Sequence, residues 1–269
     1  MNDIVFELQD VKYSYQKKYP ALCGIDMTIR QGEKIAIIGA NGTGKSTLLH
    51  MLDGLVFPDQ GRITAFGQEL SEAALADEAA AWKFRSRVGF VFQSADIQLF
   101  CPSVREDIVF GPLQLGVAAN EVARRLAEVA RVLDVGHLLD RVPQQLSIGE
   151  KRRVAIASVL AIDPEVYIFD EPTAGLDPLT VRHIIDLVVQ ANRRGKTIIT
   201  AIHDLHIVGE LADTVYVFGK DKKLARSGPV EQVLSDRAFL EAQNLVHIHG
   251  HIHEGREHVH PHLAFERHA

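Results

Sequence analysis

A glycine-rich turn followed by a lysine and a hydroxyl residue constrains this chain more than any other feature. Residues 39–46 read GANGTGKS, which fits G-x-x-x-x-G-K-S, and they lie between the apolar run KIAIIG and a helical pattern. Glycines let successive backbone N–H groups face one centre, and the helix N-terminus adds a positive dipole end. Lys45 is predicted to reach the β- and γ-phosphates of a nucleotide, and the Ser46 hydroxyl to hold Mg²⁺. The predicted phosphate-binding residues are Gly39, Ala40, Asn41, Gly42, Thr43, Gly44, Lys45, Ser46 and Thr47.

Two further apolar runs end in polar residues that complement such a phosphate site. The run VYIF ends at Asp170 and Glu171, and the run TIITAI ends at His203. A tight strand–helix turn would also use glycines, but the carboxyl ends of parallel strands meet at one edge of a sheet, where phosphates would lie. We therefore predict that Asp170 accepts a water of the Mg²⁺ shell and that Glu171 orients and deprotonates the attacking water. His203 is predicted to contact the γ-phosphate.

Short apolar runs alternate with longer helical patterns, which predicts an α/β fold with a mostly parallel sheet. Residues 94–164 contain no convincing buried strand and are predicted to form a helical insert. The predicted strands are Lys34–Gly39, Val88–Phe92, Val166–Phe169, Thr197–Ile202 and Thr214–Phe218. The predicted helices are Lys45–Leu55, Glu121–Leu133, Glu150–Ala161 and Val181–Arg194.

The composition narrows the class of protein. The 269 residues include 29 Lys and Arg against 35 Asp and Glu, and this net charge of −6 argues against nucleic-acid binding by broad phosphate neutralisation. The two cysteines, Cys23 and Cys101, form no disulfide framework or zinc pattern, which favours a reducing compartment. No apolar run approaches the ~18 residues of a membrane span, and the N-terminus lacks a signal-peptide layout. A secreted or integral membrane protein is therefore not expected.

In their order along the chain, these motifs resemble the nucleotide-binding subunits of ABC transporters over residues 1–235. Gln93 is similar to the family's Q-loop glutamine, residues 146–150 (LSIGE) to its signature motif, and residues 174–177 (AGLD) to its D-loop. The resemblance implies a P-loop NTPase fold with a RecA-like sheet, a small N-terminal antiparallel β part and an inserted helical subdomain. It divides the chain into a nucleotide-binding core (1–93 and 165–235), a helical subdomain (94–164) and a C-terminal extension with a His-rich tail (236–269).

The resemblance also implies roles for the residues of an ATP site. Tyr15 matches the aromatic residue that stacks on adenine, although it also alternates with Val11 and Tyr13 as a strand residue would. The histidine after the third strand, His203, matches the family's switch histidine. The implied Mg²⁺ ligands are Ser46, Gln93 and Asp170. The implied catalytic residues are Lys45, Gln93, Glu171 and His203.

One P-loop and one signature motif imply that two ATPase subunits, identical or similar, pair head to tail. Ser147 and Gly149 of one subunit are expected to approach the γ-phosphate of ATP held by the other, and Asp177 is expected to contribute to nucleotide binding. The commonest form of the motif is LSGGQ, and here Ile148 and Glu150 replace Gly and Gln. Ile148 would conflict with a positive φ. Ser147 and Glu150 also form a capping-box pattern, which predicts a helix start.

Residues 93–100 (QSADIQLF), 104–107 (VRED) and 110–113 (FGPL) resemble energy-coupling-factor ATPases in particular. There the segment after the Q-loop glutamine forms a short helix that docks on a transmembrane coupling protein. An exposed Leu99–Phe100 pair suits that role, and an amphipathic surface helix without a partner is the alternative. The resemblance implies a peripheral protein at the cytoplasmic face of the membrane, with a coupling protein near Gln93–Phe100 and a substrate-binding membrane subunit.

Histidines gather near the C-terminal end, where eight of the 13 lie within residues 247–268. An extended chain would place alternating histidines on one side, and imidazole binds Ni²⁺ and Co²⁺ well. This suggests a metal store beside an importer for nickel or cobalt, whereas a polar tail with incidental metal affinity is the alternative. The candidate ligands are His247, His249, His251 and His253.

Three other functions are compatible with part of this pattern. An importer ATPase for another substrate, such as a vitamin, would carry the same motifs. A soluble ABC ATPase that acts in DNA repair or on ribosomes would need a long coiled coil, a second cassette or basic patches, which the sequence lacks. A nickel metallochaperone GTPase would also join a P-loop to histidines, but its guanine-specific N-K-x-D motif is absent.

Overall fold

The computed structural model describes residues 3–253 and 256–263, and for residues 247–253 and 256–263 it describes the backbone. The largest sheet has six strands in the order β10-β9-β3-β8-β7-β6, in which β10 is antiparallel to β9 and the other pairs are parallel. The predicted α/β fold with a mostly parallel sheet is confirmed. The strands are β3 (Lys34–Gly39), β6 (Val88–Val91), β7 (Val166–Asp170), β8 (Thr197–Ala201), β9 (Thr214–Phe218) and β10 (Leu224–Pro229).

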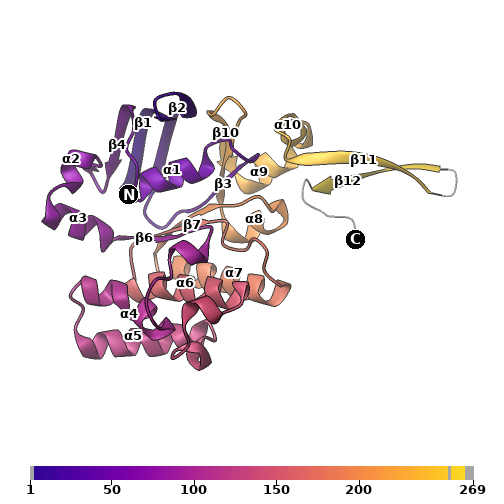
Figure 1. Ribbon diagram of the computed structural model, residues 1–269. Helices are drawn as coiled ribbons and strands as arrows, with labels where there is room; N and C mark the ends of the chain where they lie inside the picture. Colours follow the sequence, from indigo (N-terminus) through magenta and orange to yellow (C-terminus); the bar gives the residue numbers. More distant parts are fainter. Residues whose placement is uncertain (1–2, 254–255, 264–269) are drawn as a thin grey trace.

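A second sheet is antiparallel throughout and pairs its strands in the order β2-β1-β4-β5. Its strands are β1 (Ile4–Tyr15), β2 (Tyr19–Arg30), β4 (Gln60–Ala65) and β5 (Gln68–Glu69). Helix α1 (Lys45–Leu52) lies beside this sheet (Figure 1), and Leu48 and Leu49 share one buried cluster with Phe6 of β1 and Ile35 of β3. This cluster joins the two sheets and positions the start of α1. The short helices α2 (Glu72–Leu75) and α3 (Glu78–Arg85) lead from β5 to β6.

Between β6 and β7 the chain forms helices and no strand, in the lower part of Figure 1. Helix α6 (Ile148–Ile162) returns to the sheet, where Val154, Ala155 and Ile156 are fully buried. The short 3-10 helices are η1 (Ala95–Ile97), η2 (Gly136–Leu138) and η3 (Pro143–Gln145). The longer helices are α4 (Val104–Gln114), α5 (Ala119–Val132) and α6 (Ile148–Ile162).

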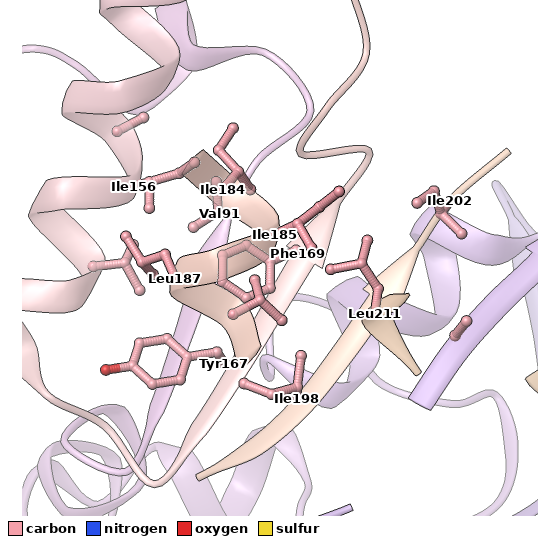
Figure 2. Close-up of a cluster of buried hydrophobic side chains, with 14 of the residues drawn as sticks. Val91, Ile156, Tyr167, Phe169, Ile184, Ile185, Leu187, Ile198, Ile202 and Leu211 are labelled. Atoms are coloured by element: carbon pink, nitrogen blue, oxygen red, sulfur yellow. The ribbon is translucent and has the colours of Figure 1, made fainter. Parts of the chain in front are cut away.

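The main hydrophobic core lies between this helical part, the six-stranded sheet and the helices α7 (Pro178–Arg193) and α8 (Leu205–Leu211). Figure 2 shows side chains of α6, α7 and α8 meeting those of the sheet. The labelled residues are Val91, Ile156, Tyr167, Phe169, Ile184, Ile185, Leu187, Ile198, Ile202 and Leu211. No helix within residues 3–253 and 256–263 combines the length and the apolar character of a membrane span.

The C-terminal part packs on the core before it leaves the body of the molecule. Helices α9 (Val230–Ser235) and α10 (Arg237–Ala242) follow β10, and Leu240, Leu245 and Val246 are buried in the main core. From Val246, where the sequence predicts a tail, β11 (Val246–His253) and β12 (Arg256–Leu263) form an antiparallel hairpin. Apolar residues and histidines alternate in β11, and this period of two suits a strand.

Candidate ATP site

The phosphate-binding loop connects β3 to α1, and its shape depends on glycine. Gly44 is the N-cap of α1 with a φ of +111°, and a Cβ there would lie 2.3 Å from the carbonyl oxygen of Ala21. The loop therefore excludes a side chain at this position. No described side chain caps α1, so the first N–H groups of the helix are left for a ligand.

Lys45 folds back into the loop and is buried. Its Nζ donates hydrogen bonds to the carbonyl oxygens of Gly39 at 2.8 Å and Ala40 at 3.3 Å. Burial lowers the pKa of the Lys45 amino group, and the carboxylates of Glu171 and Asp170 oppose that shift. The result is an ammonium group, sheltered from water and close to two carboxylates, at the centre of the loop, where the charge of a phosphate would be neutralised.

A cavity of about 460 Å³ lies over the loop. Other parts of the fold also line it, among them Tyr15 at the end of β1, the first residues of β2, Gln93 after β6 and Glu171 after β7. The loop contributes Asn41, Gly42, Gly44, Lys45, Ser46 and Thr47 to the lining. The structure thus brings most of the residues that the sequence assigns to ATP into one cavity.

Tyr15 and Lys222 also line this cavity, and Lys222 belongs to no sequence motif. Tyr15 Oη and Thr47 Oγ1 share a hydrogen bond of 3.1 Å, and the Tyr15 ring packs edge to face on Tyr13 with 5.1 Å between centroids. Lys222, in the turn between β9 and β10, donates from Nζ to the carbonyl oxygen of Gly42. It also lines the cavity and adds a positive charge beside the phosphate loop.

Asp170 and Ser46 provide oxygen atoms of the kind that Mg²⁺ prefers. Asp170 is 3% exposed, and its Oδ1 has no hydrogen-bond partner among the described residues. Burial raises the pKa of this carboxyl group, and a hydrogen bond with Ser46 opposes that shift. A buried carboxylate oxygen without a partner is costly unless a cation or a water satisfies it. The oxygens of Asp170 and Ser46 therefore fit a Mg²⁺ ion, and the predicted third ligand, Gln93, lines the same cavity as Ser46.

Glu171 and His203 contact each other directly. Glu171 Oε2 and His203 Nδ1 form a hydrogen bond, and the Glu171 N–H donates to the Ala201 carbonyl oxygen at 3.0 Å. The hydrogen bond to Glu171 raises the pKa of His203, and burial opposes this. The γ-phosphate contact of His203 stays a prediction, and in the structure its Nδ1 contacts the predicted base. The backbone hydrogen bond fixes the main chain at Glu171, and the contact with His203 orients its buried side chain.

Arg152 of α6 reaches the backbone around Gln93, a contact that the sequence motifs do not predict. Its guanidinium group donates to the carbonyl oxygens of Phe92 and Gln93. Burial lowers the pKa of Arg152, and the negative charges of Asp170 and Glu171 oppose this shift. The helix that begins at the signature motif is therefore tied to the Q-loop.

The signature residues form the N-terminal tip of α6 and do not line the cavity. Ser147 Oγ accepts the N–H of Glu150 at 3.3 Å, and the Glu150 carboxylate accepts the N–H of Ser147 at 2.8 Å, which confirms the capping box. Ile148 is the first helical residue, has no positive φ and is 75% exposed, so its side chain causes no backbone strain. A Cβ at Gly149 would meet only Leu176 Cδ2, at 4.0 Å.

Asp177 is the N-cap of α7, at the end of the predicted D-loop. Its Oδ1 accepts the N–H groups of Leu179 at 3.1 Å and Thr180 at 3.0 Å. The hydrogen bond from the Thr180 hydroxyl is the largest cause that lowers the pKa of Asp177, and these backbone N–H groups lower it further. Like the signature tip, Asp177 does not line the cavity over the phosphate loop.

The segment after Gln93 exposes apolar side chains, but not the pair that the sequence predicts. Leu99 is 5% exposed and belongs to the main core, so the prediction of an exposed Leu99–Phe100 pair is wrong for Leu99. The N–H groups of Phe100 and Cys101 both donate to Asp107 Oδ1, and this turn directs Leu99 inward and Phe100 outward. Four exposed apolar residues lie in this segment and in α4, and we call them together the apolar patch: Ile97, Phe100, Phe110 and Leu113. Within it, the rings of Phe100 and Phe110 pack edge to face, with centroids 5.0 Å apart.

The predicted nickel or cobalt ligands lie in the C-terminal hairpin. The backbones of His247, His249, His251 and His253 belong to β11, and their side chains lie outside the described part of the chain. Among the side chains that are described, no group of three or more His, Cys, Asp or Glu residues could hold a metal ion. Metal binding by these four histidines therefore stays a prediction.

The chain is similar to a known protein family and to several of its members. The family model described as ABC transporter matches residues 22–174. The nickel import ATP-binding protein NikO of Rhodobacter capsulatus is 49% identical over 244 residues, which cover 90% of this chain and 95% of NikO. The energy-coupling factor transporter ATP-binding protein EcfA of Methanothermobacter thermautotrophicus is 42% identical over 241 residues, which cover 90% of this chain and 76% of EcfA.

Two solved structures are similar to this one over most of the chain. CbiO1 from Clostridium perfringens, described as part of the ABC transporter complex cbiONQ, has 37% identity and a TM-score of 0.75, with 90% of this chain and 95% of CbiO1 covered. A dimeric ATP-binding cassette, MJ0796, bound to ADP and Pi in a post-hydrolysis state, has 26% identity and a TM-score of 0.76. That match covers 84% of this chain and 98% of the cassette.

Proposed function

This chain belongs to the ABC transporter ATPases, and from that membership we propose that it powers an energy-coupling-type importer for nickel or cobalt. The observation that carries the nucleotide part is the single cavity in which Lys45, Gln93 and Glu171 meet. The importer type is supported by the similarity to EcfA and to CbiO1. The choice of metal is supported by the similarity to the nickel import protein NikO and by the histidines near the C-terminal end.

ATP binds with its phosphates in the loop and its base at Tyr15. The N–H groups of the first turn of α1 and the Lys45 ammonium group contact phosphate oxygens, and the exposed part of the Tyr15 ring stacks on adenine. Ser46, Asp170 and Gln93 hold Mg²⁺, which neutralises phosphate charge when it is bound.

Glu171 orients the attacking water and accepts one of its protons on a carboxylate oxygen. His203 keeps that carboxylate in place through Nδ1. The water oxygen bonds to the γ-phosphorus while the bond from phosphorus to the bridging oxygen breaks, and ADP and inorganic phosphate leave. Most of the rate acceleration comes from positioning and charge stabilisation, to which a positioned base adds about 10²–10⁴-fold.

A second ATPase subunit, identical or similar, completes each site in a head-to-tail pair. Ser147 and Gly149 of one subunit then approach the γ-phosphate held by the other, with Asp177 at the same interface. The exposure of Ile148 and the absence of this tip from the lining of the chain's own cavity support the arrangement. The dimeric state of the related cassette with ADP and Pi supports it as well.

The apolar patch docks on a transmembrane coupling protein at the cytoplasmic face of the membrane, and a further membrane subunit binds the metal. Gln98 connects the patch to α6, because its Oε1 accepts the Phe92 N–H at 3.2 Å and its Nε2 donates to the Ala155 carbonyl oxygen at 2.8 Å. Arg152 of the same helix holds the Q-loop. Closure of the dimer at the tip of α6 therefore moves the patch.

The test is to purify the full chain with its co-purifying membrane subunits, reconstitute them in vesicles and measure ATP-driven uptake of Ni²⁺ and Co²⁺. We expect uptake of at least one of these ions, and none with Glu171→Gln. Phe100→Ser should prevent co-purification without lowering the thermal midpoint of the isolated chain. Trp82→Ser removes an exposed aromatic residue of α3 outside the patch and serves as the matched control.

Two outcomes would contradict parts of this proposal. Uptake of a vitamin or another organic substrate without uptake of either metal would overturn the metal assignment and leave the importer. Absence of any co-purifying membrane subunit, with GTP hydrolysed in preference to ATP, would favour a nucleotide-dependent metallochaperone. That second function is less well supported, because the guanine-specific motif is missing from the sequence.

A further inference from the structure

The turn between β9 and β10 lies against the phosphate loop, although the two are far apart in the sequence. Lys222 of this turn donates from Nζ to the carbonyl oxygen of Gly42 and lines the cavity over the loop. Lys220 and Lys223 belong to the same turn and do not line the cavity. No motif covers these three lysines, so the sequence does not distinguish them. The fold brings one of the three to the nucleotide site.

Hydrogen bonds of the backbone fix this turn in place. Within it, the Gly219 N–H donates to the Lys223 carbonyl oxygen at 2.9 Å, and the Lys222 N–H donates to the Gly219 carbonyl oxygen at 3.2 Å. The Lys222 carbonyl oxygen accepts the Cys23 N–H of β2 at 3.0 Å, and Figure 1 shows β2 near the turn that leads into β10. Both main-chain polar groups of Lys222 are thus held, which sets the position from which its side chain reaches the loop.

The backbone gives no reason for a lysine at position 222. Its φ of +66° lies in the left-handed region, which glycine adopts more readily than any residue with a Cβ. The side chain, in contrast, has a defined partner in Gly42. An unfavourable backbone conformation at a residue with such a contact points to a function of the side chain.

Packing fixes Gly44 of the phosphate loop but not Gly42. A Cβ at Gly44 would lie 2.3 Å from the Ala21 carbonyl oxygen of β2, whereas a Cβ at Gly42, where φ is +75°, would meet nothing within 4 Å. A glycine without packing neighbours can turn its peptide groups easily. The hydrogen bond from Lys222 is therefore positioned to restrain the Gly42 carbonyl group, which packing leaves free to rotate.

The direction of this carbonyl group matters because its oxygen would repel a phosphate. In a planar trans peptide the carbonyl group and the following N–H point in opposite directions. Lys222 draws the Gly42 carbonyl to its own side, so the Thr43 N–H points to the other side. That N–H makes a long hydrogen bond of 3.4 Å to the Ala40 carbonyl oxygen, which a phosphate oxygen at a usual distance of about 2.9 Å would replace favourably.

We propose that Lys222 is a positioning residue for phosphate binding. Its ammonium group holds the Gly42 carbonyl away from the nucleotide and thereby keeps the Thr43 N–H directed at the phosphates. This role rests on the proposed ATP site and adds a second lysine to it, on the opposite side of the loop peptide from the phosphates. Because Lys222 contacts the loop and not the reacting atoms, it strengthens the binding of ATP and of ADP and takes no direct part in hydrolysis.

Substitutions at position 222 separate the side chain from the backbone. Lys222→Met keeps the aliphatic part of the side chain and removes the charge. ATP and ADP should each bind about five- to twentyfold more weakly, as expected for the loss of a charge-assisted hydrogen bond. Lys222→Gly should bind them as weakly, yet its thermal midpoint should not fall, because glycine adopts a φ of +66° readily. Lys222→Arg keeps a cationic donor and should recover most of the affinity.

The matched control is Lys223→Met, which removes an exposed lysine of the same turn outside the cavity and should bind both nucleotides as the wild type does. Calorimetric titration of the full-length protein with ATP and with ADP measures the affinities, and steady-state hydrolysis gives kcat and KM. In Lys222→Met the KM for ATP should rise with the loss of affinity, while kcat changes less than about twofold.

Wild-type affinity in Lys222→Met and Lys222→Gly would overturn this inference. A loss of affinity that Lys222→Arg does not recover would overturn it too, because the cation would then not be the cause. A fall in kcat at unchanged KM would place Lys222 in the chemical step and not in positioning. Nucleotide binding as described, without ATP-driven uptake of nickel or cobalt, would contradict the proposed importer and leave this inference intact.

Discussion

Two helices of this chain begin at predicted nucleotide-binding motifs. They differ in whether side chains of the protein accept hydrogen bonds from their N-terminal N–H groups. Helix α1 has glycine at its N-cap, no side-chain cap and no acidic residue in its first turn. Helix α6 has Ser147 at its N-cap and Glu150 in its first turn, joined in a reciprocal capping box. The end of α1 keeps its donors and its positive dipole for an anion, and at the end of α6 the N–H groups of Ser147 and Glu150 are satisfied internally.

The difference agrees with the proposed function, in which one motif holds a phosphate within a single chain and the other acts across an interface. Around α1, Tyr15, Lys45 and Lys222 come from separate parts of the fold to enclose one cavity. At α6 the tip is exposed, and the hydrogen bond from the Ser147 N–H lowers the pKa of Glu150 and keeps it charged. The phosphate loop is therefore formed within one chain, whereas under the proposed function the signature tip acts on the nucleotide of a second subunit.

The largest effect is expected from Glu171→Gln, which separates binding at α1 from hydrolysis. The amide keeps the shape of the side chain but cannot accept the proton of water, so hydrolysis should slow by about 10²–10⁴-fold. ATP binding should persist, and an ATP-bound dimer should accumulate, because nothing reopens it. Single-turnover hydrolysis and size-exclusion chromatography with ATP measure the two results. Wild-type turnover in this variant would disprove the role of Glu171.

Matched glycine substitutions at the two helix ends test the contrast directly. A Cβ in Gly44→Ala would lie 2.3 Å from the Ala21 carbonyl oxygen at a φ of +111°, so the loop must distort. At an expected strain of about 1–3 kcal/mol, ATP should bind roughly ten- to a hundredfold more weakly, and the thermal midpoint should fall.

Gly149→Ala is the counterpart, because its Cβ would meet only Leu176 Cδ2 at 4.0 Å. Alanine in a helix is more stable than glycine by about 0.5–1 kcal/mol, so the thermal midpoint should not fall. ATP binding to the monomer should be unchanged, while hydrolysis decreases about tenfold because the methyl group meets the partner's nucleotide. Equal loss of monomer ATP binding in the two variants, measured by calorimetry, would remove the distinction between the helix ends.

Most of the phosphate site at α1 can be predicted from the sequence, because its residues lie next to short patterns in the chain. The loop, the run VYIF before Asp170 and the run TIITAI before His203 are short patterns whose chemistry sits beside them in the chain. Parallel strands bring their carboxyl ends together. The sequence therefore predicts the strands β3, β7 and β8, the loop residues and Glu171 that line the cavity, and His203, which contacts Glu171.

The contacts that complete the site come from residues distant in the chain and without a motif. Lys222 reaches Gly42 across 180 residues, and Arg152 reaches the carbonyl oxygens of Phe92 and Gln93 across about sixty. Neither has a spacing that marks it as functional. Leu99 was assigned to the surface because no sequence pattern reveals the turn made by Asp107. Such contacts depend on tertiary packing, which a periodic pattern does not encode.

A smaller effect is expected from Glu150→Gln, which restores the commonest residue of the signature motif. The amide can still accept the Ser147 N–H, but the negative charge near the partner's γ-phosphate is gone. The ATP concentration for half-maximal hydrolysis should fall about two- to fivefold, equivalent to roughly 0.4–1 kcal/mol. Glu231→Gln, which removes a first-turn glutamate of α9, should leave this concentration unchanged. An increase in Glu150→Gln would contradict the assigned repulsion.

The smallest effect concerns the pH dependence of the capped helix end. Because the hydrogen bond from the Ser147 N–H lowers the pKa of Glu150, the folded protein holds the charged carboxylate more tightly than the unfolded chain does. This stabilisation is fully present above the unfolded pKa of about 4.3 and is lost as the pH falls through the lower folded pKa. Urea midpoints should therefore favour the wild type over Glu150→Gln at pH 6, and this advantage should shrink toward pH 3.5. An advantage that stayed constant over that range would mean that the carboxylate charge does not contribute to the cap, and the electrostatic contrast with α1 would then be limited to the interface.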